Sequence, residues 1–223
     1  MIQAIGEILP LAIGIAISPV PIIAIILMLI TPKARSNGLA FLGGWLLGLA
    51  IVGTIVLIVA NTAGVATSSG PSQTVSAIKL VLGLLLLFAA WRQFQKRPAP
   101  GEEAPLPKWM KALDSFTPAR SVAIGALLSG VNPKNLVLNA TAAAGIAQTG
   151  LSGVEQAVVL LVLIVVASIG VAAPVGVYFL MGDRAVSVLD SWKAWLAANN
   201  ATVMTVLLLV FGVVLVGKGI GGL

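Results

Sequence analysis

The segment Ser129-Gly130-Val131-Asn132-Pro133-Lys134-Asn135 sets a proline, two asparagines and a lysine inside an apolar run that extends from residue 120 to about residue 148. This run is long enough to cross a bilayer as a helix, and Lys134 falls roughly 21 Å from its start. A lysine near the bilayer centre costs about 2.5 to 3.5 kcal/mol on insertion scales, so such a residue usually faces a cavity or a partner. Because Pro133 removes a backbone donor, we expect the helix to open just before it.

Three asparagines form a polar stripe beside Lys134. Their spacing of i, i+3 and i+7 places their amides on one face of a helix. A polar stripe next to a helix break predicts a lined substrate site, with Ser129, Asn132, Pro133, Lys134, Asn135 and Asn139 as its residues in this half of the chain. The alternative is structural: Lys134 snorkels to the interface, or lies in a buried hydrogen-bonded cluster that holds helices together.

The composition is that of a polytopic membrane protein, since 59% of the 223 residues are hydrophobic and only 9% are charged. The chain has no cysteine and no histidine, which argues against disulfides, Ser-His or Cys-His catalysis and the common metal and haem sites. It also lacks a Gly-x-x-x-x-Gly-Lys-Ser/Thr motif for nucleotides. We therefore expect no enzyme activity, no cofactor and no bound metal.

Six apolar stretches predict an all-helical fold with six transmembrane helices. The first is interrupted by Ser18-Pro19-Val20-Pro21, because two prolines within one turn cannot lie in an unbroken helix. In the second, Gly44 and Gly48 permit close helix contact, either within the chain or in a homodimer. The predicted spans cover about residues 2–30, 38–60, 77–94, 120–148, 154–180 and 201–217, with a separate amphipathic stretch at 185–196 before the last.

The distribution of Lys and Arg predicts the orientation. The connections after spans one, three and five carry Lys33, Arg35, Arg92, Lys96, Arg97, Lys108, Lys111, Arg120, Arg184 and Lys193, whereas the opposite side has Lys79 and Lys218. By the positive-inside rule, the chain is a multi-pass protein of the cytoplasmic (inner) membrane with both termini outside. The net charge of +6 thus reflects topology and contact with membrane lipids, and we expect no nucleic-acid partner.

A proline-rich basic linker divides the chain into two halves of opposite topology. We predict a first transmembrane repeat at residues 1–94, a cytoplasmic linker at 95–119 and a second repeat at 120–223. Each half opens with a broken span, and inverted repeats with interrupted helices in matching positions indicate a transporter site near the midplane. Ser18, Pro19 and Pro21 complete the predicted substrate site. The amides at a half-helix N-terminus suit an anionic group, which Lys134 would reinforce.

The motifs at the two breaks carry a family resemblance. Pro19-Val20-Pro21, the turn Arg35-x-x-Gly38 and Asn132-Pro133-Lys134 resemble the corresponding motifs of the LysE superfamily of exporters, although Val20 replaces the superfamily's central glycine. The stretch from Ile17 through Gly48 is more closely similar to the GAP or Sap-like family, whose names refer to addressing of glycolipids and sulfolipids in actinobacteria. The resemblance implies a membrane transporter of a lipid-linked or glycolipid substrate.

Two other functions remain open from the sequence. The superfamily resemblance also allows export of a small polar metabolite or amino acid. A non-transporting scaffold for a glycolipid export complex would instead depend on the linker. For energy coupling, Glu7 and Glu155 lie near the outer ends of spans one and five and are candidates for proton transfer, with a purely interfacial or helix-terminal role as the alternative.

Overall fold

The structure is a computed structural model that describes residues 1–62, 73–95 and 116–222. All secondary structure in these residues is helical, which confirms the all-helical part of the predicted fold class. Most of the predicted linker, residues 96–115, lies outside the described part. The helices are α1 (Ile2–Ala16), α2 (Pro19–Leu29), α3 (Ala34–Thr62), α4 (Gln73–Gln95), α5 (Pro118–Gly130), α6 (Pro133–Ala147), α7 (Gly153–Met181), the 3-10 turn η2 (Gly182–Arg184) and α8 (Ala185–Ile220).

Both predicted helix breaks are confirmed. α1 and α2 are bent by 54° relative to each other, and two residues, Val131 and Asn132, separate α5 from α6. At each break a polar N-cap residue, Ser18 or Asn132, precedes a proline at the first helical position. The residue before a proline is pushed out of the helical conformation, and here both N-caps have positive ψ angles, 95° and 121°. The two breaks share one register, in which Ser18 corresponds to Asn132.

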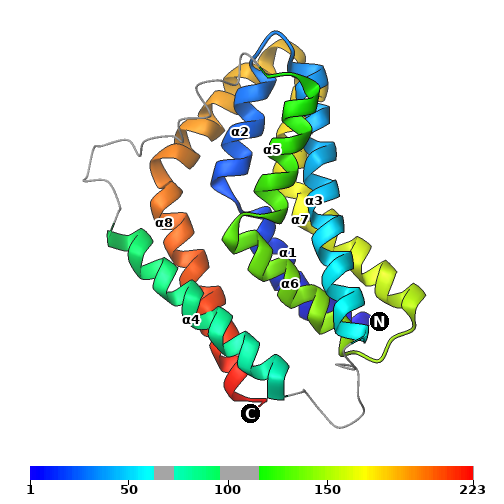
Figure 1. Cartoon of the computed structure of the whole chain (residues 1–223). Coiled ribbons are helices and arrows are strands. Elements are labelled where there is room, and N and C mark those ends of the chain that lie inside the picture. The colour runs from blue at the N-terminus through cyan, green and yellow to red at the C-terminus, as the bar shows by residue number, and fades with distance from the viewer. Residues whose placement is uncertain (63–72, 96–115, 223) are drawn as a thin grey trace.

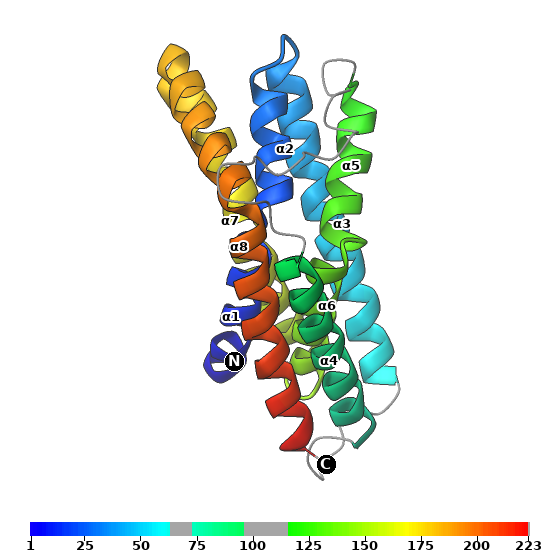
Figure 2. The same ribbon diagram turned by 90° about the vertical axis from the view of Figure 1, so that its left-hand side faces the viewer.

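The helices form one bundle in which both chain ends lie toward the same end (Figure 1). α3 packs along α5, and α4 packs along α8 (Figure 2). α7 and α8 meet at the turn Gly182–Arg184, at the end opposite the termini. Near the termini, the half-helices α1 and α6 pack on each other; at the opposite end, α2 packs on α3, α7 and α8, and α5 packs mainly on α3.

The apolar helices fit a membrane protein. In the described residues, three helical segments are long and apolar enough to cross a membrane, Ala34–Thr62, Ser76–Gln95 and Gly153–Ile220, and the bent pair α1–α2 would make a fourth. Large hydrophobic side chains are exposed along these segments, for example Ile55 on α3, Leu85 on α4 and Val165 on α7. Such a surface is suited to lipid rather than water.

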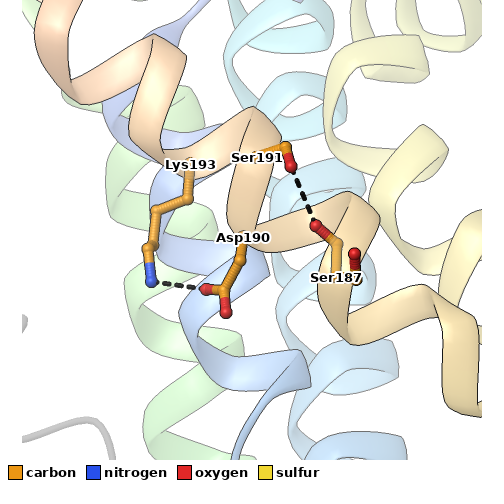
Figure 3. Close-up of polar contacts among 4 residues, drawn as sticks. All are labelled: Ser187, Asp190, Ser191 and Lys193. Atoms are coloured by element: carbon orange, nitrogen blue, oxygen red, sulfur yellow. Dashed lines mark hydrogen bonds and ion pairs between the residues drawn. The ribbon is translucent and has the colours of Figure 1, made fainter.

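The predicted separation between the amphipathic stretch 185–196 and the last span is wrong, because both belong to the single helix α8. Asn199 does not interrupt it, since its side-chain amide donates to the carbonyl of Trp195 one turn earlier at 2.8 Å. The exposed face near the start of α8 carries an ion pair between Lys193 and Asp190 at 2.6 Å, and Ser191 donates to the carbonyl of Ser187 (Figure 3).

The small residues of α3 serve packing within the chain. A Cβ added at Gly44 would meet the backbone of Val122, and one added at Gly48 would meet the Ser129 hydroxyl and the backbone of Ala126. These two glycines therefore let α3 approach α5 closely. Because they face α5, they do not supply a surface for a second chain, and a homodimer through another face stays a prediction.

Candidate functional site at the paired helix breaks

The Lys134 ammonium joins the two breaks. Lys134 lies in the first turn of α6 and is only 3% exposed, and its Nζ donates to the carbonyl oxygen of Gly14 at 2.7 Å, to that of Ile17 at 2.9 Å and to the Ser18 hydroxyl at 2.8 Å. An ammonium has three protons, so every donor of Lys134 has an acceptor. All three acceptors belong to the end of α1 or to the two residues between α1 and α2.

The carbonyl groups at the end of α1 are fully paired as a result. The last four carbonyls of a helix lack intrahelical partners and are costly to bury unpaired. The carbonyl of Ile13 accepts from the N–H of Ile17, that of Ile15 from the Ser18 hydroxyl at 2.6 Å, and that of Ala16 from the N–H of Ser18. Lys134 supplies the missing donor for Gly14 and places its charge at the negative end of the α1 dipole.

Ser18 and Asn135 extend this cluster to the second break. The Ser18 hydroxyl lies 3.0 Å from Oδ1 of Asn135, whose Nδ2 donates to the carbonyl of Leu128 in the last turn of α5 at 3.0 Å. Two neighbouring residues of α6, Lys134 and Asn135, thus cap the ends of α1 and α5. Of the two interpretations of Lys134 from the sequence, this geometry favours the buried hydrogen-bonded cluster.

The start of each second half-helix offers few donors to a ligand. In α2, Pro19 and Pro21 have no N–H, and the N–H of Ile22 donates to the carbonyl of Ser18. Only the backbone N–H of Val20 is left in this first turn. In α6, Pro133 has none and the N–H of Lys134 donates to Oδ1 of Asn132 at 3.2 Å. An anion at the breaks therefore has fewer amide donors than the sequence suggests, and the ammonium of Lys134 is already engaged.

Two buried polar atoms, one on α6 and one on α3, have no partner. Asn139 is fully buried, its Nδ2 donates to the carbonyl of Leu49 on α3 at 3.0 Å, and its Oδ1 is unpaired. Trp45 on α3 is also fully buried with an unpaired Nε1. Unpaired buried groups call for a ligand or water. Asn139 belongs to the polar stripe predicted from the sequence, whereas Trp45 was not predicted, since its only signal is a tryptophan next to Gly44.

An apolar cavity of about 340 Å³ adjoins the first break. It lies between α2, α7 and α8 and is lined by Ile22, Gly170, Ala173, Ser191, Trp192, Trp195 and Leu196. Gly170 ties it to the break, since a Cβ added there would meet the carbonyl of Ala16, the last residue of α1. Sequence reasoning did not find this cavity, because three segments far apart in the chain form it.

The comparison with known families supports the resemblance seen in the sequence. Residues 8–221 match the family described as Sap, sulfolipid-1-addressing protein. The chain belongs to this family. Searches of curated proteins and of solved structures gave no significant match.

In this Sap family member, the two carboxylates predicted for proton transfer lie in different settings. Glu155 forms a capping box at the start of α7: its carboxylate accepts from the backbone N–H of Ser152 at 3.0 Å, and the Ser152 hydroxyl accepts from the Glu155 N–H at 3.4 Å. That is a helix-terminal role. Glu7 lines a small cavity near the chain termini together with Lys79 and Lys218. Neither carboxylate contributes to the cluster around Lys134.

Proposed function

We propose that this Sap family protein is a transporter that moves a lipid-linked or glycolipid substrate across the cytoplasmic membrane. The observation that carries the proposal is the position of the apolar cavity next to the first helix break. An acyl chain fits a cavity lined by Trp192, Trp195 and Leu196. The unpaired polar atoms at Asn139 and Trp45 are fully buried in this structure, and in the proposed cycle they contact the polar head group when the breaks open. Lipid cargo needs both kinds of surface within one molecule.

The packing of the half-helices supports a moving mechanism. α1 and α6 pack on each other near the termini. In the described residues, α2 and α5 do not form such a packed pair with each other. Lys134 and Ser18 lie between the α1–α6 end and the α2–α5 end, and their hydrogen bonds connect the two breaks. In the proposed cycle, the chain is a six-span, LysE-like inverted repeat with both termini outside, and the breaks act as hinges that exchange which pair of half-helices is closed.

Spin-label distances test the movement directly, because the natural chain has no cysteine. Cysteine pairs at Ile30 and Arg120 report on the α2–α5 end, and pairs at Gln3 and Thr149 report on the α1–α6 end; all four side chains are exposed. When vesicles without glycolipid are compared with vesicles that contain a sulfolipid extract, we expect the sulfolipid to shorten the first distance and lengthen the second. Distances that stay fixed with both would contradict the cycle.

Transport itself is tested with vesicles that contain purified protein and a fluorescent glycolipid. We expect the protein to speed the movement of the label between leaflets, as measured by its protection from an impermeant quencher. The folded Lys134→Met variant should be slower, and Lys193→Met, which changes a partly exposed lysine on α8, should match the wild type. Saturable efflux of a small solute without lipid movement would favour the metabolite exporter. If the protein moves neither the lipid nor the solute, the scaffold would be favoured.

A further inference from the structure

A second cavity, which is polar, lies near the chain termini and apart from the helix breaks. It has a volume of about 40 Å³ and is formed where the early turns of α1 and α4 meet the later part of α6 and the end of α8. Its polar lining consists of Glu7, Lys79, Thr141, Gln148, Thr149 and Lys218. A water needs about 10 to 15 Å³ on this measure, so the cavity has room for a few waters or one tetrahedral oxyanion.

The charge in this cavity is not balanced by ion pairing. Two lysines and one carboxylate line it, and the ion pair found among the described residues is that of Lys193 with Asp190, elsewhere on α8. Lys79 is half-buried and its Nζ donates to the neutral side-chain oxygen of Gln148 at 3.2 Å. A cation that is partly removed from water gains from an anionic partner. Glu7 attracts Lys79 across the cavity, but no ion pair joins it to either lysine in the described residues, and one carboxylate does not balance two ammonium groups.

Two further donors in the cavity have no acceptor. Thr141 is 7% exposed and its hydroxyl is unpaired, although a threonine in a helix commonly donates to a carbonyl of the preceding turn. Nε2 of Gln148 is buried and unpaired as well, and the contact of Lys79 with Oε1 fixes the orientation of this amide. Lys218 lies in the last turn of α8, where the helix dipole alone would favour a lysine. The dipole does not explain why the buried Thr141 hydroxyl has no partner.

We infer that Lys79, Lys218, Thr141 and the Gln148 amide bind an oxyanion, a sulfate or phosphate group, at the end of the bundle that carries the termini. The two ammonium groups supply charge, and the hydroxyl and amide supply directed hydrogen bonds to the oxygens. The group belongs either to a free ion or to a lipid head group. This site is separate from the proposed transport path at the breaks and does not depend on it.

The test uses full-length protein and follows unfolding by tryptophan fluorescence. One arm titrates sodium sulfate and sodium phosphate at low millimolar concentration and constant ionic strength, because high sulfate stabilises proteins in general. A second arm compares nanodiscs of phosphatidylcholine with nanodiscs that also contain phosphatidylglycerol. The variants are Lys79→Gln, Lys218→Gln and the near-isosteric Thr141→Val, with Lys193→Gln as the matched control on the exposed face of α8.

We expect a saturable rise in melting temperature for the wild type and for Lys193→Gln, and an apparent affinity weakened about tenfold or more in the two lysine variants. A shift with the free ions assigns the site to a free oxyanion, and a shift with phosphatidylglycerol alone assigns it to a head group. The proposal is overturned if neither arm gives a saturable shift. It is also overturned if Lys218→Gln shows the same shift as the wild type. Lys218 is exposed, so that variant remains informative if Lys79→Gln fails to fold.

Discussion

The ammonium of Lys134 lies 2.7 Å from the carbonyl oxygen of Gly14, so a residue in the second half of the chain completes the end of a helix in the first. The sequence shows only that a lysine occurs in an apolar span. The structure shows that this lysine replaces the hydrogen bond that α1 loses when Pro19 forces it to end. The energetic cost of burying the charge is thereby offset by three hydrogen bonds and the helix dipole.

Lys134→Met keeps the volume and apolar stem of the side chain but leaves three buried acceptors with one donor fewer each. We expect it to lower the free energy of unfolding by about 2 kcal/mol or more, because buried groups without partners each cost about 1–3 kcal/mol. The measurement is thermal or denaturant unfolding in detergent. The control is Lys193→Met, whose exposed ion pair should contribute about 1 kcal/mol or less. Equal stability of the two variants would show that the cluster around Lys134 is energetically minor.

Ser18→Ala tests whether Ser18 and Lys134 act as one unit. Their side chains are 2.8 Å apart, so the double variant with Lys134→Met should be less destabilised than the sum of the single changes, by about 1 kcal/mol. Ser168→Ala is the matched control, because Ser168 is a buried serine that donates only to the carbonyl of Ile164 on its own helix. Its effect should add to that of Lys134→Met. Additivity in both cycles would rule out coupling between the breaks.

Gly43 and Gly44 provide a neighbouring pair for testing the α3–α5 contact. A Cβ at Gly44 would meet the backbone of Val122, whereas one at Gly43 has nothing within 4 Å. We expect Gly44→Ala to cost about 1–3 kcal/mol from overpacking and Gly43→Ala to be neutral or stabilising by up to about 1 kcal/mol from helix propensity. Unfolding of the two variants side by side gives the answer. A destabilised Gly43→Ala would mean that the face of α3 opposite α5 is also packed.

The helix breaks could be predicted from the sequence, whereas the partners at the breaks could not. Pro19 and Pro133 act locally, and their effect on the backbone follows from geometry. The acceptors of Lys134 lie more than a hundred residues away in the chain, and tertiary packing decides them. The same holds for the apolar cavity, which needs Ile22, Gly170 and Trp192 brought together from three helices. The continuity of α8 was missed because an amphipathic stretch and an apolar span differ in composition, although the backbone of α8 runs through both without a break.

Glu155→Gln separates a capping role from proton transfer. Glutamine can still form the capping box with Ser152 but cannot titrate. We expect the variant to show wild-type transport and the same dependence of transport on pH, as measured in vesicles with an imposed pH gradient. Ser152→Ala serves as the comparison, since it removes the serine half of the box and should lower stability by about 1 kcal/mol. Loss of pH-dependent transport in Glu155→Gln would assign coupling to this carboxylate.

Asn139→Leu is expected to affect transport more than stability. Leucine removes the side-chain bond to the carbonyl of Leu49, but it also removes a buried oxygen that has no partner, so the two effects largely cancel in the free energy of unfolding. If that oxygen contacts the polar part of the cargo, transport of the fluorescent glycolipid should fall about tenfold, as expected for the loss of one directed hydrogen bond.

The control for this change is Asn199→Leu on α8, where the asparagine is half-buried and its amide bonds to its own helix. It should leave transport unchanged. If Asn139→Leu also transports normally, Asn139 holds α6 against α3 and does not contact cargo, and the polar contact must be sought at Trp45. If Asn139→Leu instead unfolds, the conservative Asn139→Gln, which keeps both the donor and the acceptor, should restore folding and show whether the acceptor's position matters for transport.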